Sequence, residues 1–141
     1  MTAVDRLQQA LAGEHAAVYG FEVLAAQASG SLRTRLSRAL DEHRAARDAL
    51  TARINAQGAV PVSAERGYVV PGRGSDQADD VEDSAALMEQ RLGVLYAQAI
   101  EDPDPQVRRV GLAGLRATTI RATSWTGIVQ DLPGLQQPSV G

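Results

Sequence analysis

The sequence of 141 residues contains no cysteine and no lysine, and these absences narrow the possible functions. A chain without cysteine forms no disulfides, has no thiolate nucleophile and binds no metal through sulfur. Apart from the two histidines, all of its basic residues are arginine, a bias that we attribute to a GC-rich genome rather than to binding. The formal net charge of −3 argues against a nucleic acid or an anionic membrane as a partner.

Aromatic residues and long apolar runs are also scarce. The chain has three tyrosines, one tryptophan and one phenylalanine, and its abundance of Ala and Leu favours helix over sheet. No apolar run reaches the roughly 18 residues that read as a membrane-spanning helix. The N-terminal stretch carries Asp5 and Glu14 and lacks the apolar core of a signal peptide. We therefore expect a cytoplasmic protein.

Hydrophobic periodicity predicts four helices, over residues 2–28, 32–57, 78–100 and 105–130. Thr2 is placed to cap the first helix, Gly58 to stop the second, and Pro105 to occupy the first turn of the fourth. Residues 131–141 follow as an irregular tail. We assign residues 1–130 to a single domain, because a chain of this length suits one hydrophobic core.

A long connection, residues 58–77, separates the second predicted helix from the third. The other connections are short, which makes the helices that they join antiparallel neighbours. About twenty extended residues reach roughly 60 Å, whereas a helix of about 25 residues is only roughly 38 Å long. A compact domain rarely keeps so long a loop unless the loop crosses the whole domain. The pattern therefore predicts an all-α fold, a four-helix bundle with one long crossover between helices two and three.

Charged residues interrupt the inward faces of the predicted helices at similar heights. Folding the first helix against the second places Glu14 level with His43 and Arg47, and a fourth helix parallel to the first brings Arg121 to the same layer. An unpaired charge inside a bundle is strongly unfavourable, so we expect these groups to pair with one another. Trp125, one turn after Arg121, is expected to fill the core, with a cation–π contact to Arg121 as the alternative.

The stretches "GEHAAVYGFEVL" and "DEHRAARDAL", together with the long crossing, resemble the ferritin-like superfamily. They are most similar to a small bacterial ferritin-like domain family of uncharacterised function, and the resemblance covers the four predicted helices. It implies a site for two iron ions between the helices. In such a site two helices each give a Glu, and the other two each give a Glu-x-x-His motif.

Only part of that ligand set is present in this chain. Glu14 matches the ligand expected from the first helix, but Glu42 is followed three residues later by Ala45, where the pattern has histidine. Glu89 on the third helix lies off the centre of the predicted inward face. Residues 106–130 contain no Asp, Glu or His. A complete di-iron site within this chain is therefore excluded by the number of ligands.

Three interpretations of the charged layer follow. In the first, Glu14, His43, Arg47 and Arg121 form a buried polar network, without metal or cofactor, that fixes the register of the helices. In the second, Glu14, His43 and Glu89 form a degenerate site for one iron or manganese ion, which the nearby arginines would repel. In the third, the two arginines bind a small anionic ligand through its carboxylate or phosphate.

We favour the first interpretation, which makes the protein a non-catalytic bundle, because no other catalytic motif is present. A metal-dependent oxidase or hydroxylase is the alternative, reached only by analogy with ferritin-like enzymes. A second apolar strip, away from the predicted core, favours a helix-packed homodimer, and a wide buried face within one chain is an equal alternative. This strip consists of Leu87 and Val94 on the third helix and Leu112, Leu115 and Ala122 on the fourth.

Overall fold

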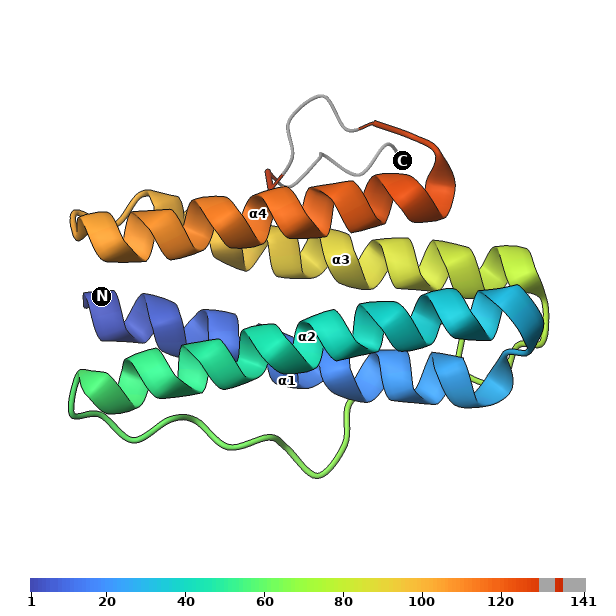
Figure 1. Cartoon of the computed structure of the whole chain (residues 1–141), viewed down its shortest axis with the longest axis horizontal. Coiled ribbons are helices and arrows are strands. Elements are labelled where there is room, and N and C mark those ends of the chain that lie inside the picture. The colour runs from blue at the N-terminus through green and yellow to red at the C-terminus, as the bar shows by residue number, and fades with distance from the viewer. Residues whose placement is uncertain (130–133, 136–141) are drawn as a thin grey trace.

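The structure, a computed structural model, describes residues 1–129 and 134–135. These residues form four helices and no strand: α1 (Ala3–Gln27), α2 (Gly30–Ala56), α3 (Ala78–Ile100) and α4 (Pro105–Thr126) (Figure 1). The prediction of an all-α chain with four helices is confirmed. None of the four is long and apolar enough to cross a membrane. Apart from residues 134–135, the predicted tail over residues 131–141 lies outside the described residues.

Thr2 caps the start of α1 and Pro105 lies in the first turn of α4, both as predicted. The Thr2 hydroxyl accepts a hydrogen bond from the backbone N–H of Asp5 at 3.2 Å, and the Asp5 carboxylate accepts one from the Thr2 N–H at 2.8 Å. This reciprocal pair satisfies N–H groups that have no partner within the helix. Pro105 takes the first position of α4, where its missing N–H costs nothing.

Glycines in the left-handed region mark the ends of α2 and α4. Gly58, with φ of 77°, follows the last turn of α2 as predicted. Gly127, with φ of 71°, ends α4 at Thr126, earlier than the predicted end at residue 130. Ile128, inside the predicted range of the fourth helix, therefore lies beyond α4 and is 69% exposed. At the other end of the second helix, α2 begins at Gly30 rather than at residue 32.

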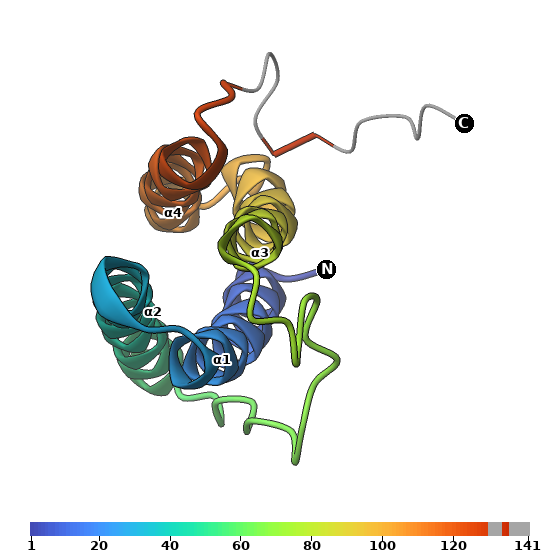
Figure 2. The ribbon, with the colours of Figure 1, turned by 90° about the vertical axis from the view of Figure 1, so that its right-hand side faces the viewer.

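The four helices pack as two antiparallel pairs. The pair α1 and α2 lies against the pair α3 and α4, chiefly through contacts between α1 and α3 (Figure 1). Viewed along the bundle, α2 faces α4 across the other side (Figure 2), and the contacts between these two helices are sparse. The α2–α4 side is therefore the more open face of the bundle.

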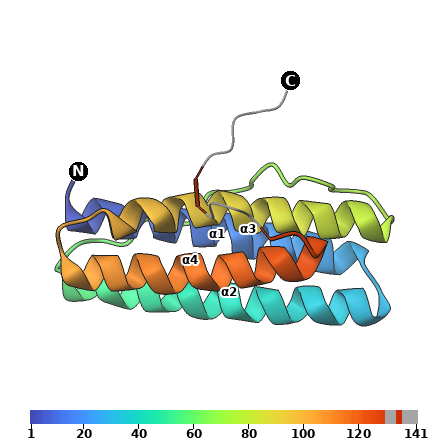
Figure 3. The same cartoon turned by 90° about the horizontal axis from the view of Figure 1, so that it is seen from above.

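Residues 58–77 run along the outside of α1 from one end of the bundle to the other (Figure 3). At the start of this segment, the Gln8 side chain donates to the Val60 carbonyl at 2.7 Å and accepts from the Val62 N–H at 2.8 Å. At its end, the Gln27 amide donates to the carbonyl of Gly72 at 2.9 Å. Because the segment returns to the end where α2 began, α2 and α3 run in the same direction.

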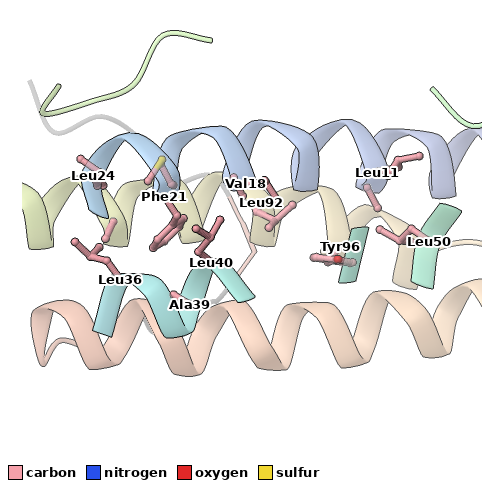
Figure 4. Packing of buried hydrophobic residues seen from close by; sticks show 14 of the residues in the cluster. Leu11, Val18, Phe21, Leu24, Leu36, Ala39, Leu40, Leu50, Leu92 and Tyr96 are labelled. Atoms are coloured by element: carbon pink, nitrogen blue, oxygen red, sulfur yellow. The ribbon is translucent and has the colours of Figure 1, made fainter. Parts of the chain in front are cut away.

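Apolar side chains from all four helices fill the centre of the bundle (Figure 4). On α3, Tyr96 is 3% exposed and belongs to the buried face, whereas Leu95 is only partly buried. Glycines on α4 make room for this ring. A Cβ at Gly111 would lie 2.7 Å from the Tyr96 carbonyl oxygen, and a Cβ at Gly114 would overlap the Tyr96 ring. These two glycines therefore let α3 and α4 approach each other closely.

The strip that we predicted as a dimer face is divided between the core and the surface. Ala122 is 5% exposed and belongs to the interior, because α4 is rotated from its predicted orientation. Leu115 packs partly against the core, and a Cβ at Gly134 would lie 2.9 Å from its Cδ1. Leu112 is 62% exposed, so this part of the strip faces solvent.

Candidate functional site

Each helix contributes one charged or titratable side chain to a layer in the interior of the bundle. Glu14 comes from α1, His43 from α2, Glu89 from α3 and Arg121 from α4. Glu14 is 1% exposed, and His43 and Glu89 are both 0% exposed. The Arg121 side chain is 15% exposed and reaches the layer from the α2–α4 side. We call these four residues the ion-pair layer.

The imidazole of His43 lies between the two carboxylates. Its Nδ1 donates to Glu14 Oε2 at 2.7 Å, and its Nε2 donates to Glu89 Oε1 at 2.8 Å. Because a carboxylate only accepts, both ring nitrogens carry a hydrogen and the ring is an imidazolium. Burial lowers the pKa of His43, but the hydrogen bonds and negative charges of the two carboxylates outweigh burial and raise the pKa to about 9.

Arg121 closes the layer on the side of α4. Its Nε donates to Glu89 Oε1 at 2.8 Å, and its NH1 donates to Glu42 Oε2 at 2.9 Å. Burial lowers the pKa of Arg121, but the charge of Glu89 and the hydrogen bonds that Arg121 donates to Glu89 and Glu42 raise it above its ordinary value. Glu42 is half exposed, so Arg121 links the buried layer to the surface of α2.

Tyr96 provides the second hydrogen bond to the Glu14 carboxylate. Its hydroxyl donates to Glu14 Oε1 at 2.5 Å, so each oxygen of this carboxylate accepts one hydrogen bond. Burial raises the pKa of Tyr96, and the neighbouring charge of Glu14 raises it further, so the phenol stays neutral. The second oxygen of Glu89, Oε2, has no hydrogen-bond partner among the described residues.

The charges of the layer balance. Glu14 and Glu89 are the two anions, and His43 and Arg121 are the two cations. A buried ion pair with satisfied hydrogen bonds contributes little net stability, yet removal of one partner strands the other charge in a medium of low dielectric. The layer therefore fixes how the four helices meet and makes each of its members hard to replace.

Arg47 does not belong to the layer, and this part of the prediction is wrong. Its side chain is 31% exposed, and its Nε donates to Asp48 on the surface at 3.0 Å. Arg47 lies at the border of the buried face of α2, where a long side chain can extend its charged end into water. The cation that we expected from Arg47 is supplied by His43 itself.

Trp125 fills the core, as expected, and is 6% exposed. Its cation–π partner is Arg35 of α2, whose Cζ lies 4.5 Å from the ring centroid, and not Arg121. Arg121 is already held by two carboxylates, so its guanidinium points toward the layer. The alternative, a cation–π contact between Arg121 and Trp125, is therefore wrong.

Neither the role of Tyr96 nor the partner of Glu42 was predicted, and Glu89 was predicted to lie off the centre of the inward face. A small rotation of α3 explains two of these errors, because Glu89 and Tyr96 are seven residues apart and share one face. The pairing of Glu89 with His43 could have been predicted, because a carboxylate level with His43 can neutralise its charge. The sequence gives no such signal for Glu42, because Glu42 lies on the surface. It belongs to the site only because the long Arg121 side chain contacts it.

The residues of the layer do not fit a metal ion. The two nitrogens of His43 face different carboxylates, so Glu14 and Glu89 lie on opposite sides of the ring instead of converging on one point. The Arg121 guanidinium, 2.8 Å from Glu89, would also repel a cation. Within residues 1–129 and 134–135, no group of three or more His, Cys, Asp or Glu is placed to hold a metal ion.

A pocket of about 270 Å³ adjoins the layer between α2 and α4. Glu14 and Tyr96 lie at its inner side, and Arg121 and Glu42 also line it. The rest of its wall is mainly small apolar side chains, including Ala46, Ala49, Ala113, Gly114 and Ala117. Because Glu14 is already bonded to His43 and Tyr96, the pocket presents no carboxylate that lacks a partner.

The fold and the buried layer define a class of protein, an all-α four-helix bundle with a charged interior. The chain belongs to a family defined by a domain of unknown function, DUF4439, whose model matches residues 6–137. It is similar to the crystal structure of a conserved hypothetical protein, rv2844, from Mycobacterium tuberculosis, with 27% sequence identity and a TM-score of 0.79. That similarity covers 90% of this chain and 97% of the other. No curated protein matches the chain significantly.

Proposed function

We propose that this protein is a ferritin-like bundle that acts without catalysis, as a structural or interaction module. In this proposal the ion-pair layer occupies the place where ferritin-like proteins bind iron. The observation that carries it is the imidazolium of His43 held between Glu14 and Glu89. The segment 58–77 alongside α1 and the parallel course of α2 and α3 support the ferritin-like assignment.

In this chain, side chains already provide the charge neutralisation that metal ions provide in a di-iron bundle. Metal cations there offset the negative charge of carboxylates that project inward from the helices. In this chain His43 and Arg121 offset Glu14 and Glu89 through three hydrogen bonds of 2.7–2.8 Å. The layer is therefore electrically complete with its own side chains.

The two alternative functions have less support. A metal-dependent oxidase or hydroxylase needs open coordination positions, and the histidine nitrogens are both engaged with carboxylates. A small anionic ligand held by Arg47 and Arg121 needs two converging guanidiniums. Arg47 instead pairs with Asp48, and Arg121 is held by Glu89 and Glu42.

Metal analysis of protein purified without chelators tests the proposal. We expect only trace iron and manganese, and no saturable binding when the protein is titrated with Mn(II), or with Fe(II) in the absence of oxygen. The control pair is Glu14→Gln, which changes the layer, and Glu22→Gln, which changes an exposed glutamate paired with Arg44. About one equivalent of metal per chain, lost in Glu14→Gln and kept in Glu22→Gln, would overturn the proposal.

For the interaction role we propose a second copy of the chain as the partner, across the solvent-facing part of α4. Leu112 is 62% exposed and Ile120 is 60% exposed, and exposed large apolar side chains favour association. Light scattering coupled to gel filtration should give the mass of a dimer, and Leu112→Glu should give a monomer. Val60→Glu, at an exposed valine outside the helices, should remain dimeric. A monomeric wild-type protein would contradict this part of the proposal.

A further inference from the structure

A second pocket, of about 240 Å³, lies between α1, α3 and the segment 58–77. Its walls are largely apolar, and Val70 and Leu92 are buried on two of its sides. Gly13 and Ala16 form the side toward α1, and the Leu92 and Leu95 side chains pack closely against Gly13. The pocket shares no lining residue with the ion-pair layer.

The stretch "YVVP", residues 68–71, forms the outer wall of this pocket. Tyr68 packs against Tyr19 of α1 with the two rings tilted at 59° and 5.5 Å between their centroids. Val70 turns inward and is 7% exposed, whereas Val69 turns outward at the rim and is 96% exposed. The rim of the pocket therefore carries an apolar side chain that is almost wholly in water.

The wall is held on both sides, so the pocket exists before any ligand arrives. Before the stretch, the His15 ring lies 2.9 Å from the Val62 carbonyl. After it, the Gln27 side chain accepts from the Gly74 N–H at 3.0 Å and donates to the Ser75 carbonyl at 2.7 Å. A preformed site binds more tightly, because little conformational freedom is lost on binding.

The charge of one lining residue indicates which class of ligand suits this pocket. Of the residues that line the pocket in the described part of the chain, only Arg91 is charged. It is exposed on α3 and forms no ion pair or side-chain hydrogen bond with any other described residue. An arginine at the edge of an apolar pocket favours an anionic group, above all a carboxylate, which its planar fork can hold with two hydrogen bonds.

We propose that this pocket binds a small aliphatic carboxylate, with its chain against Val70 and Leu92 and its head group on Arg91. A volume of about 240 Å³ is below the range of roughly 300–1,000 Å³ typical of drug-sized ligands, so the ligand is a short chain rather than a long-chain lipid. This inference goes beyond the proposed function and is independent of it, because metal in the layer would leave the pocket unchanged.

Calorimetric titration with octanoate, kept below its micellar concentration, tests the proposal. We expect one site per chain with a Kd of about 0.1–1 mM, the range of a small ligand with one charged contact. Val69→Asp adds a negative charge at the rim without a cost to folding, and should weaken octanoate binding about tenfold. Its matched control is Val60→Asp, at an 85% exposed valine of the same segment that does not line the pocket, and it should bind as the wild type does.

A second variant separates the head group from the chain. Arg91→Gln should weaken octanoate about fivefold or more and leave the binding of 1-octanol unchanged, because only the carboxylate uses the guanidinium. Arg116→Gln, at an exposed arginine of α4, should change neither. The proposal would be overturned if the wild-type protein showed no saturable binding of octanoate, or if Val69→Asp and Val60→Asp bound octanoate equally. It would also be overturned if the protein bound only to phosphatidylglycerol vesicles. The last contrary outcome is that Val69→Asp disrupts a dimer while octanoate does not bind.

Discussion

The hydroxyl of Tyr96 on α3 donates a hydrogen bond to the Glu14 carboxylate on α1, across the interface that joins the two helix pairs. The other oxygen of Glu14 is bonded to His43 on α2. One buried carboxylate thus connects three helices. Gly114 on α4 lies against the Tyr96 ring, so the fourth helix packs against the residue that donates to Glu14.

Removal of the Tyr96 hydroxyl should be costly. Tyr96→Phe leaves Glu14 Oε1 buried without its donor, and we expect a loss of about 1.5–3 kcal/mol in the free energy of unfolding, measured with urea. Tyr19→Phe is the matched control, because the Tyr19 hydroxyl lies near the surface and accepts only a long 3.4 Å bond from Arg73. Equal losses in the two variants would show that Tyr96 acts by packing alone.

Removal of the Glu14 carboxylate should cost more. Glu14→Ala strands the His43 imidazolium and leaves a cavity, and we expect a loss of about 3–5 kcal/mol. Glu22→Ala, which breaks an exposed pair with Arg44, should lose at most about 1 kcal/mol. A loss below about 1 kcal/mol in Glu14→Ala would place this side chain in solvent and contradict the register of α1.

The two arginines that we predicted in the layer should now behave differently. Arg121→Ala leaves Glu89 with one donor fewer inside the bundle, so we expect a loss of about 3 kcal/mol. Arg47→Ala removes a pair with Asp48 at the surface, and its loss should stay below about 1 kcal/mol. Parallel urea titrations of the two variants give the comparison, and similar losses would return Arg47 to the interior.

The raised pKa of His43 predicts that stability falls as the pH rises. The pKa is about 9 in the folded chain, against 6.5 for an unperturbed histidine. Below pH 6.5 the ring is protonated in both states, so the stabilisation is fully present, and it is lost as the pH rises through about 9. The loss should reach roughly 3 kcal/mol, measured by urea unfolding between about pH 6 and pH 9.5.

Two further measurements test whether this pH dependence of stability comes from His43. His15→Asn should retain it, because the His15 ring faces the Val62 carbonyl outside the layer. An NMR titration of the His43 ring should show no change of charge near neutral pH. Titration of that ring close to its ordinary pKa of 6.5 would mean that Glu14 and Glu89 do not hold it as an imidazolium.

Much of the fold could be predicted from the sequence because its signals are local. The four helices follow from apolar periodicity, and Thr2, Gly58 and Pro105 mark helix ends through groups within a few residues of themselves. The end of α4 was placed too late, although Gly127 offered the same kind of signal as Gly58. Apolar residues after Gly127 extended the periodicity and concealed this stop.

Glu14 was correctly placed level with His43 because the short turn between α1 and α2 fixes which of their residues lie opposite each other. Arg121 was assigned to the same layer from a fourth helix parallel to the first, but its partners Glu89 and Glu42 were not predicted. The placement of Arg47 in the layer, and of Glu89 off the centre of the inward face, was wrong for a different reason. A rotation of a helix by a few tens of degrees exchanges residues between core and surface. Periodicity in one helix does not determine that rotation.

The sequence by itself determined four helices, a long crossing segment and a set of charged residues too poor in carboxylates and histidines for a full di-iron site. Only the tertiary structure decided which charges meet, because Arg121 reaches Glu89 and Glu42 through packing between helices that are distant in the chain. Pairing of buried charges depends on ångström-scale distances, which side-chain packing sets and local sequence patterns do not.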